Sequence, residues 1–596
     1  MVDNFRWDTT RLYPAPDSAE LERDFLKASA EARAFRERYQ GKVAQLDAAG
    51  LLEALLSYES LQECASLPQL YGHLLFASDS ESDTHKSLMQ RGMEFGNELS
   101  RDLLFFDLEI MAIPAEKFDP IVSDARLANY HHHLSAIRRF QPYALPEREE
   151  QLLTLKNLTG VQAFSKLFDE LTASLSYRME LDGEERDFTG EELISLLHHP
   201  NAKLRERAFT VFLNGHADQG IVLSTVFNTV ALDHGQEMEL RGYSHPMQPT
   251  NLGNELSDEA IEHLMQVTEK NFPIAQEYFR LKAKLLGMDR LKNTDVYAPV
   301  GECHKTYSFE EAQKLVIDSY SAFNPEYGQL IEGFFSDGRI DVEPRPGKSG
   351  GAFCMGLTPK LPPYLLLNFT GNLRDVATMA HELGHGLHYL RSQDQTMLNY
   401  HAPLPLAETA SVFGEMLLTS RMLEQESDRE VRIALLCATI EDIIATTFRQ
   451  VVLTRFEQRM HLERKNGLLT SDRLCEIWWE ENGKLFGDSV EMIDPYRWGW
   501  SYISHFIHSR FYCYAYTFAE LLVLSLYARY RETGPAFAPI LDAILKSGGS
   551  LSPGDTAHIA GIDINDLGFW QKGYDLLGDL LADLGKLLEE PVGQKL

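Results

Sequence analysis

Residues 377–390, ATMAHELGHGLHYL, carry three histidines and one glutamate within a short stretch. His381 and His385 are four residues apart, so on an α-helix their rings project from the same face. Two neutral imidazoles at this spacing can bind one zinc ion at about 2.0–2.1 Å each. Glu382 lies about 100° further round the helix, where its carboxylate can reach a water molecule on the metal. We therefore predict a zinc site of the HExxH type, with Glu382 as the general base.

A zinc site of this kind needs a third protein ligand and an open position for water. His388 lies on the correct face, but His381 and His388 are two turns apart, about 10 Å along the helix axis, which strains a tetrahedral site. Glu408, on the segment that follows, can reach the metal from a helix that folds back on the first. We prefer Glu408 as the ligand and keep His388 as the alternative third ligand or a substrate contact. Glu415, on the face of Glu408, can orient a ligating histidine.

A capped helix and a short sheet are predicted to position these residues. Asn372 can cap a helix whose apolar face includes Val376, Ala380 and Leu383. The preceding segment, 340–371, is rich in Gly and Pro and contains the β-prone runs AFCMG and YLLLNF. This pattern indicates a small sheet or hairpin immediately before the histidine helix.

The hairpin is a candidate for binding substrate. Gly350 and Gly351, followed by Ala352, lead into a β-prone run, and glycine allows another backbone to approach closely. An extended peptide that adds to an edge strand is a common recognition mode, and a turn without any ligand is the alternative. The GKS in this segment does not form a phosphate loop, because Val342 occupies the position of the first glycine that such a loop requires.

The rest of the chain shows helical periodicity, which predicts a mainly α protein. Apolar residues recur at intervals of three and four residues over 18–43, 257–287 and 430–467. The formal net charge of −32 argues against a nucleic acid or an anionic membrane surface as a partner. The N-terminus lacks a basic region followed by an apolar one, and the six cysteines are scattered singly. We expect a cytoplasmic protein with reduced thiols.

HELGHGLHYL followed by LAETASVFGE resembles the M3 metallopeptidases, and specifically their oligoendopeptidase F branch. Further likeness in WDTTRLYPAPDS, GKSGGAFC and HFIHSRFYCYAYTFAELL extends the resemblance over nearly the whole chain. The resemblance implies one zinc ion per chain, bound by His381, His385 and Glu408. Glu408 matches the family's E-x-x-S context, in which Ser411 supports the ligand.

The resemblance also implies a fold and a set of further site residues. The fold is a mainly α, two-lobed ellipsoid around a deep channel, with an N-terminal helical region over 1–200 and a catalytic region over 201–596. His505, Tyr512 and Tyr516 match the family's His/Tyr segment and are expected to stabilise the oxyanion. On one continuous helix these three side chains would share a face; an aromatic-rich helix in the core is the alternative.

Together these features predict a zinc oligoendopeptidase that cuts internal bonds of short, unstructured peptides. Zinc would lower the pKa of its water, and Glu382 would move the proton to the leaving amine. One alternative is a zinc carboxypeptidase or dipeptidyl carboxypeptidase, which needs a positive group for the free C-terminus of its substrate. Another is a non-catalytic helical peptide-binding protein, whose structural zinc would have four protein ligands.

Overall fold

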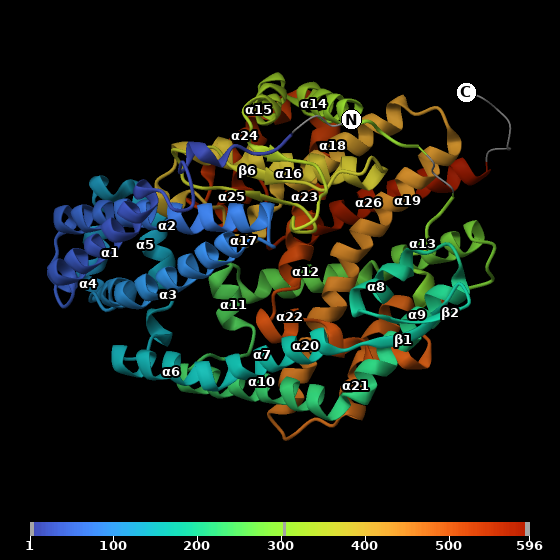
Figure 1. The fold of residues 1–596 in the computed structure, drawn as a ribbon, viewed down its shortest axis with the longest axis horizontal. Helices are drawn as coiled ribbons and strands as arrows, with labels where there is room; N and C mark the ends of the chain where they lie inside the picture. The colour runs from blue at the N-terminus through green and yellow to red at the C-terminus, as the bar shows by residue number, and fades with distance from the viewer. Residues whose placement is uncertain (1–4, 302–304, 590–596) are drawn as a thin grey trace. The chain divides into compact units, whose positions relative to one another are not determined.

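The computed structural model describes residues 5–301 and 305–589, which form two compact units. Each unit is built from three separate segments of the chain: 1–144, 305–424 and 529–563 in the first unit, and 145–304, 425–528 and 564–596 in the second. Most of the described residues are helical, which confirms the prediction of a mainly α fold (Figure 1). None of the described helices has both the length and the apolar character required to cross a bilayer.

The first unit opens with three long helices, α1 to α3, which lie side by side in Figure 1. Ser18 caps α1 through its hydroxyl, and Phe35, Leu55 and Phe106 pack in the shared core. The helices of this unit are α1 (Ala19–Tyr39), α2 (Ala48–Ser78), α3 (Asp83–Met111), α4 (Ala115–Val122), α5 (His131–Arg138), α14 (Phe309–Phe323), α15 (Pro325–Ser336), α16 (Leu373–Arg391), α17 (Leu404–Ala407), α18 (Thr409–Gln425), α24 (Ala538–Ser547) and α25 (Pro553–Ile559).

A three-stranded sheet precedes the histidine helix, as predicted. Its strands are β4 (Ile340–Asp341), β5 (Phe353–Met355) and β6 (Tyr364–Leu366), in the order β4-β6-β5. β6 is buried and pairs in parallel with β4 and antiparallel with β5, so that Cys354 lies opposite Leu365. β5 pairs with β6 alone and therefore forms an edge of the sheet.

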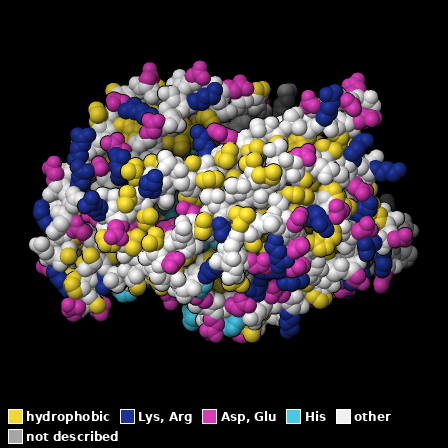
Figure 2. All heavy atoms as spheres, turned by 90° about the horizontal axis from the view of Figure 1, so that it is seen from below, with side chains coloured by type: hydrophobic (Ala, Val, Ile, Leu, Met, Phe, Trp, Pro, Cys, Tyr) yellow, Lys and Arg dark blue, Asp and Glu magenta, His cyan; other side chains and the backbone are white. Residues whose placement is uncertain are grey.

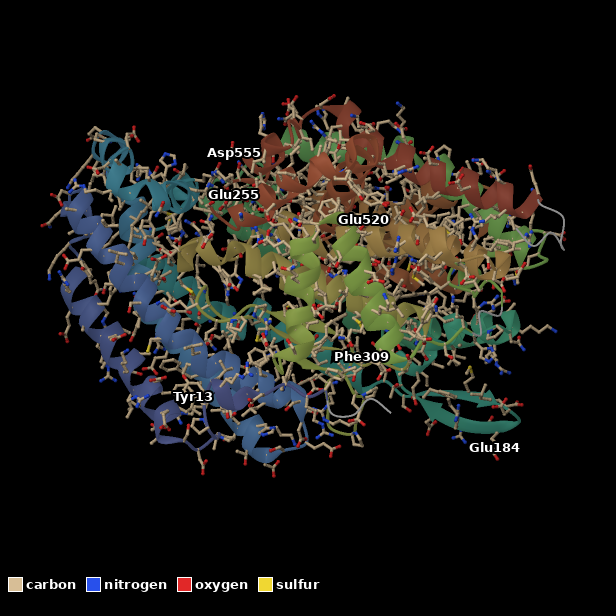
Figure 3. All side chains as sticks on the ribbon, turned by 90° about the horizontal axis from the view of Figure 1, so that it is seen from above. Tyr13, Glu184, Glu255, Phe309, Glu520 and Asp555 are labelled. Atoms are coloured by element: carbon tan, nitrogen blue, oxygen red, sulfur yellow. The ribbon has the colours of Figure 1, made fainter. Side chains whose placement is uncertain are left out.

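Helix α16 carries the histidine motif and begins with the predicted cap. The side chain of Asn372 accepts a hydrogen bond from the backbone of Asp375, whose carboxylate in turn accepts from the backbone of Asn372. Tyr320 of α14 donates a 2.8 Å hydrogen bond to the carbonyl of Ala380. α14 packs beside α15, where the ring centroid of Phe309, labelled in Figure 3, lies 5.9 Å from that of Phe335. These contacts hold α16 rigidly from one side.

α16 and α18 approach so closely that a side chain does not fit between them at Gly384. A Cβ atom added there would lie 2.5 Å from the carbonyl oxygen of Ala410 and 2.5 Å from the Cα of Ser411. The small residue in the motif therefore admits the backbone of a neighbouring helix. This contact brings the start of α18, and with it Glu408, against the histidine face of α16.

The second unit contains most of the remaining helices and two small sheets. β1 (Tyr177–Leu181) and β2 (Glu184–Phe188) form an antiparallel hairpin whose turn end is marked by Glu184 in Figure 3. β3 (Leu291–Lys292) pairs in parallel with β7 (Val490–Glu491). The helices are α6 (Glu147–Thr159), α7 (Val161–Ser174), α8 (Gly190–Ser195), α9 (Ala202–Asp218), α10 (Gly220–Arg241), α11 (Gln248–Gly253), α12 (Asp258–Lys270), α13 (Phe272–Leu285), α19 (Arg429–Thr446), α20 (Phe448–Arg464), α21 (Ser471–Phe486), α22 (His505–His508), α23 (Tyr514–Thr533) and α26 (Leu567–Glu589).

Two predicted helical stretches are each interrupted. Residues 257–287 form α12 and α13, which separate at Asn271, because Pro273 in the first turn of α13 lacks the amide that would continue α12. Residues 430–467 form most of α19, then α20, with a break at Thr447. Thr517 donates a hydrogen bond to the carbonyl of Thr447, which supports the break through a tertiary contact.

The surface and the thiols agree with the composition. On the face shown in Figure 2, acidic side chains mix with Lys, Arg and apolar side chains, and the described residues form no continuous basic patch there. The cysteines at 64, 354, 437, 475 and 513 are free thiols. Cys303 lies outside the described residues.

We expect Gly384→Ala to destabilise the protein by about 1–3 kcal/mol, because the new methyl group would collide with backbone atoms that cannot rotate away. Thermal unfolding measures the effect. Gly578→Ala is the matched control in α26, where an added Cβ meets no atom within 4 Å, and it should be neutral or stabilising by up to about 1 kcal/mol. Equal melting temperatures for the two variants would contradict the close contact of α16 and α18.

Candidate metal centre

Three side chains of the first unit converge on one point. His381 Nε2 lies 3.1 Å from His385 Nε2, and Glu408 Oε2 lies 3.3 Å and 3.4 Å from these two nitrogens. A tetrahedral ion with bonds of about 2.0–2.1 Å places its ligand atoms about 3.3–3.4 Å apart. The three atoms therefore already have the spacing of ligands around such an ion. Within the described part of the chain, they form the one group of three acidic, histidine or cysteine side chains with metal-binding geometry.

Glu408 and His381 are each held by a second residue. Glu408 lies at the junction of α17 and α18, and the hydroxyl of Ser411 donates a 2.7 Å hydrogen bond to its Oε2. Nδ1 of His381 donates to Oε1 of Glu415 over 2.6 Å, because a carboxylate can only accept. This bond holds the proton on Nδ1 and orients the ring so that Nε2 faces Glu408 and His385.

The charge of the cluster favours a cation. Burial lowers the pKa of His385 to about 4, so this imidazole is neutral near pH 7, as a ligand must be. Burial also acts to lower the pKa of His381, but the hydrogen bond and charge of Glu415, together with Glu408, raise it to about 9. The carboxylates of Glu408 and Glu415 thus impose a negative potential on the histidines that a metal ion can neutralise.

Glu382 is buried beside the cluster with one oxygen unpaired. Its exposed fraction is 7 %, and Oε2 has no hydrogen-bond partner among the described residues. Burial, with the nearby charges of Glu408 and Glu415, outweighs the charge of His381 and raises the pKa of Glu382 to about 7. A buried carboxylate with a free oxygen can accept a proton from a water molecule that lies beside it.

Glu382 faces a cavity of about 260 Å³ in the first unit. His388, which is 7 % exposed, lines the same cavity and does not belong to the three-residue cluster. Burial lowers the pKa of His388 to about 4. The structure therefore places His388 in the wall of the cavity and Glu408 in the cluster with His381 and His385.

Several residues of the cavity wall were not predicted from the sequence. Phe353 and Cys354 of β5, Tyr389 at the end of α16, and Tyr400 with His401 complete one side of it. Tyr389 lies four residues after His385 on α16, so helical spacing could have placed it on the same face as the motif. Tyr400 and His401 lie in a connection that returns to α16, a proximity that no local pattern encodes.

The glycine hairpin leads into the edge strand. Gly350 and Gly351 have open space around the position of a Cβ atom, and Gly351 has a positive φ of +74° that favours glycine. Asn368 donates hydrogen bonds to the carbonyls of Ser349 and Gly351, which hold the turn. Ala352 follows and lines the cavity with Glu382.

His505, Tyr512 and Tyr516 come together in the second unit, but not on one helix. α22 ends at His508 and α23 begins at Tyr514, so the condition of one continuous helix, on which the shared face depended, is not met. The ring centroids are nevertheless 5.1–5.8 Å apart, and Nε2 of His505 lies 3.2 Å from the hydroxyl of Tyr516.

Two residues near the break explain this arrangement. The buried Phe511 has a positive φ of +56° and turns the chain between the two helices, with its ring centroid 4.9 Å from that of His461. Tyr514 points elsewhere and accepts a 2.8 Å hydrogen bond from Asn254. Tertiary packing, and not the spacing along one helix, thus brings His505, Tyr512 and Tyr516 together.

We expect Glu415→Ala to weaken metal binding by about 10- to 100-fold, because His381 loses the acceptor that fixes its tautomer. Competition with a zinc-sensitive chelating dye measures the affinity. Glu424→Ala on the same helix is the control, since Glu424 is exposed and its one recorded ion pair, with Arg421, is long at 4.0 Å. A Glu415→Ala affinity equal to that of the control would contradict the role of Glu415.

Comparison with known proteins agrees with this geometry. The model for peptidase family M3 matches residues 195–576, and a model described as oligopeptidase F matches residues 109–177. Oligopeptidase PepF of Bacillus subtilis is 26% identical over 535 residues, which span 88% of this chain and 79% of that protein. An oligoendopeptidase F homolog of Lactococcus lactis is 24% identical over 99% of this chain and 98% of its own length.

A solved structure supports the fold. The crystal structure of oligoendopeptidase-F from Enterococcus faecium superimposes with a TM-score of 0.73 at 22% sequence identity, and the match covers 96% of this chain and 99% of that one. The M3 model covers more than half of the chain, including the whole of α16 and α18. The chain therefore belongs to peptidase family M3, in its oligopeptidase F branch.

Proposed function

We propose that the chain is a zinc-dependent oligoendopeptidase, which hydrolyses internal bonds of short, unstructured peptides. The proposal depends above all on the triangle of His381, His385 and Glu408, whose ligand atoms have the spacing of a tetrahedral zinc site. The names of the Bacillus and Lactococcus relatives, an oligopeptidase and an oligoendopeptidase F homolog, support short peptides as substrates.

One zinc ion per chain would supply Lewis-acid activation of water and of the peptide carbonyl. Glu382 accepts the proton of the attacking water and delivers it to the leaving amine. Its burial and its unpaired Oε2 suit this task. A structural zinc in a non-catalytic peptide-binding protein is disfavoured, because such a site has four protein ligands and no use for a buried base.

We propose further that His505, Tyr512 and Tyr516 donate hydrogen bonds to the oxyanion that forms on the scissile carbonyl. The grouping of the three rings and the match to the family's His/Tyr segment support this role. Burial and the positive charge of Arg449 lower the pKa of His505, so its ring is neutral near pH 7 and can still donate one N–H.

The substrate backbone is proposed to pair with the free edge of β5. Among the strands of the described residues, Phe353–Met355 pair with β6 alone, so an extended peptide can add on the other side. Gly350 and Gly351 leave space for it, and Ala352 and His388 would contact its side chains in the cavity next to Glu382.

The remaining assignments are proposals of the same kind. We propose that residues 1–200 form an N-terminal helical region and residues 201–596 the catalytic region, a division supported by the ranges of the two family models. We also propose a cytoplasmic location. Because the net charge is −32, short peptides are proposed as partners in preference to nucleic acids or anionic membranes.

Glu382→Gln should lower peptide hydrolysis by at least about 10²–10⁴-fold while one zinc ion per chain remains bound, because the base is lost and the ligands are kept. Mass spectrometry of short peptides blocked at both ends, together with metal analysis, measures both quantities. Removal of the metal by a chelator should abolish cleavage by the wild-type protein, and added zinc should restore it.

The same experiment separates the alternatives. Cleavage that requires a free C-terminus would replace the endopeptidase by a carboxypeptidase or dipeptidyl carboxypeptidase. A wild-type protein that binds zinc but cuts no peptide would indicate a peptide-binding protein. Full activity of Glu382→Gln would exclude Glu382 as the base.

Tyr516→Phe is expected to lower kcat by about 10²–10³-fold with a smaller change in KM, because a donor to the oxyanion acts mainly in the transition state. Tyr514→Phe is the matched control two residues away, since the hydroxyl of Tyr514 is bonded to Asn254. Steady-state kinetics with one peptide compare the two variants. Similar kcat values for both would refute a catalytic role for Tyr516.

A further inference from the structure

Arg449 in the second unit is a half-buried arginine without a carboxylate partner. It lies in the first turn of α20, and its Nη1 donates to the hydroxyl of Tyr297 over 3.4 Å. Within the described part of the chain, no Asp or Glu oxygen lies within ion-pair distance of its guanidinium. The groups that interact with its charge include Tyr297, Tyr502 and His505, none of which is a carboxylate.

Two other arginines of the same helix are paired with carboxylates. Arg455 contacts Glu262 and Glu269 at 3.0 Å and 2.8 Å, and Arg459 contacts Glu481 at 2.7 Å. A partly buried guanidinium loses hydration and is normally compensated by a carboxylate in this way. At Arg449 the compensation is missing from the described residues, so the site favours an anion from outside the chain.

The surrounding groups suit one carboxylate. A guanidinium presents a planar fork of N–H donors that matches the two oxygens of a carboxylate. Tyr297 and Tyr502, which reach Arg449 from separate segments, each offer a hydroxyl that can also donate. All three side chains are half-buried, so the site is sheltered but reachable from solvent.

The position of the site within its unit connects it to the substrate. Tyr502 ends the 3₁₀ helix Asp494–Tyr502, and His505 begins α22 three residues later. The charge of Arg449 contributes to the lowered pKa of His505. The same His505 lies 3.2 Å from Tyr516 in the proposed oxyanion group. An anion at Arg449 would therefore be bound next to groups that are proposed to contact the peptide.

We propose that Arg449, assisted by the hydroxyls of Tyr297 and Tyr502, binds a carboxylate of the peptide substrate. This inference rests on the proposed peptidase function. The carboxylate is either the free C-terminus of a short peptide or an acidic side chain, and both present the same chemistry. Binding at Arg449 would favour substrates that carry a carboxylate over otherwise identical substrates without one.

The test compares three forms of one peptide: a C-terminal acid, the corresponding amide, and the amide with Glu in place of Gln. We expect the wild-type kcat/KM to be about 10-fold or more higher for one carboxylate form than for the plain amide. Arg449→Met should reduce this ratio to about 1. Arg464→Met, a half-buried control on the same helix whose Nε donates to the carbonyl of Asn228, should retain the ratio.

Each outcome decides the inference. Preference for the acid over the amide identifies the C-terminus as the source, and preference for the Glu peptide identifies a side chain. A wild-type protein without either preference, or Arg449→Met with the wild-type ratio, overturns the proposal. If Arg449→Met lowers kcat/KM by the same factor for all three peptides, Arg449 supports the fold and does not bind a carboxylate. Arg449→Lys keeps the positive charge but loses the planar pair of N–H donors, so it should give an intermediate ratio of kcat/KM values. If Arg449→Met does not fold, Arg449→Lys is measured in its place.

A binding measurement separates this inference from the proposed function. Fluorescence polarisation of the labelled acid and amide peptides on Glu382→Gln, with and without Arg449→Met, requires no turnover. A tighter Kd for a carboxylate form that disappears with Arg449→Met supports the site even if the wild-type protein cleaves nothing. Equal Kd values for all forms, with active wild-type enzyme, would reject Arg449 while leaving the peptidase intact.

Discussion

The close backbone contact between α16 and α18 is the constraint on which the metal centre depends. Gly384 allows this contact, because any side chain there would overlap the backbone of Ala410 and Ser411. His381 and His385 face the junction from one helix, and Glu408 enters it from the start of the other. A metal site built from two elements requires their separation to be fixed within a fraction of an ångström, and a glycine contact between backbones fixes it without a flexible side chain.

The same contact concentrates negative charge in a buried place. Glu382, Glu408 and Glu415 lie around two histidines: Glu408 contacts both rings and Glu415 contacts His381, while Glu382 is influenced only by the nearby charge of His381. Close carboxylates in a low dielectric repel one another. A divalent cation removes this repulsion, so the proposed zinc would contribute to the stability of the first unit as well as to its chemistry. The fixed separation of α16 and α18 and the negative charge between them thus both favour a divalent cation.

Local patterns were enough to predict the centre of the site. The spacing of His381 and His385 and the cap at Asn372 depend on one helix, whose period the sequence displays directly. Glu408 lies on another element, and the choice between it and His388 depended on helix geometry and on the family motif. The structure brings Glu408 into the cluster and leaves His388 in the cavity wall.

Long-range packing determined what the sequence could not predict. Phe511 adopts a left-handed backbone without being glycine, so the break between α22 and α23 has no local signal. Tyr400 and His401 reach the cavity through a returning loop. The lack of a carboxylate beside Arg449 is a property of the folded unit, because no sequence pattern records which charges remain unpaired. Sequence periodicity predicted the helices well, and their ends and partners required the three-dimensional structure.

The central claim is that His381, His385 and Glu408 bind one catalytic zinc ion. X-ray absorption at the zinc edge of the purified protein tests it most directly, because it reports the number and type of ligands. We predict one zinc ion per chain, with two imidazole nitrogens and further oxygen ligands at about 2.0–2.2 Å. In His385→Ala, one imidazole should be lost. A spectrum with sulfur ligands, or with the same two imidazoles in His385→Ala, would contradict the account.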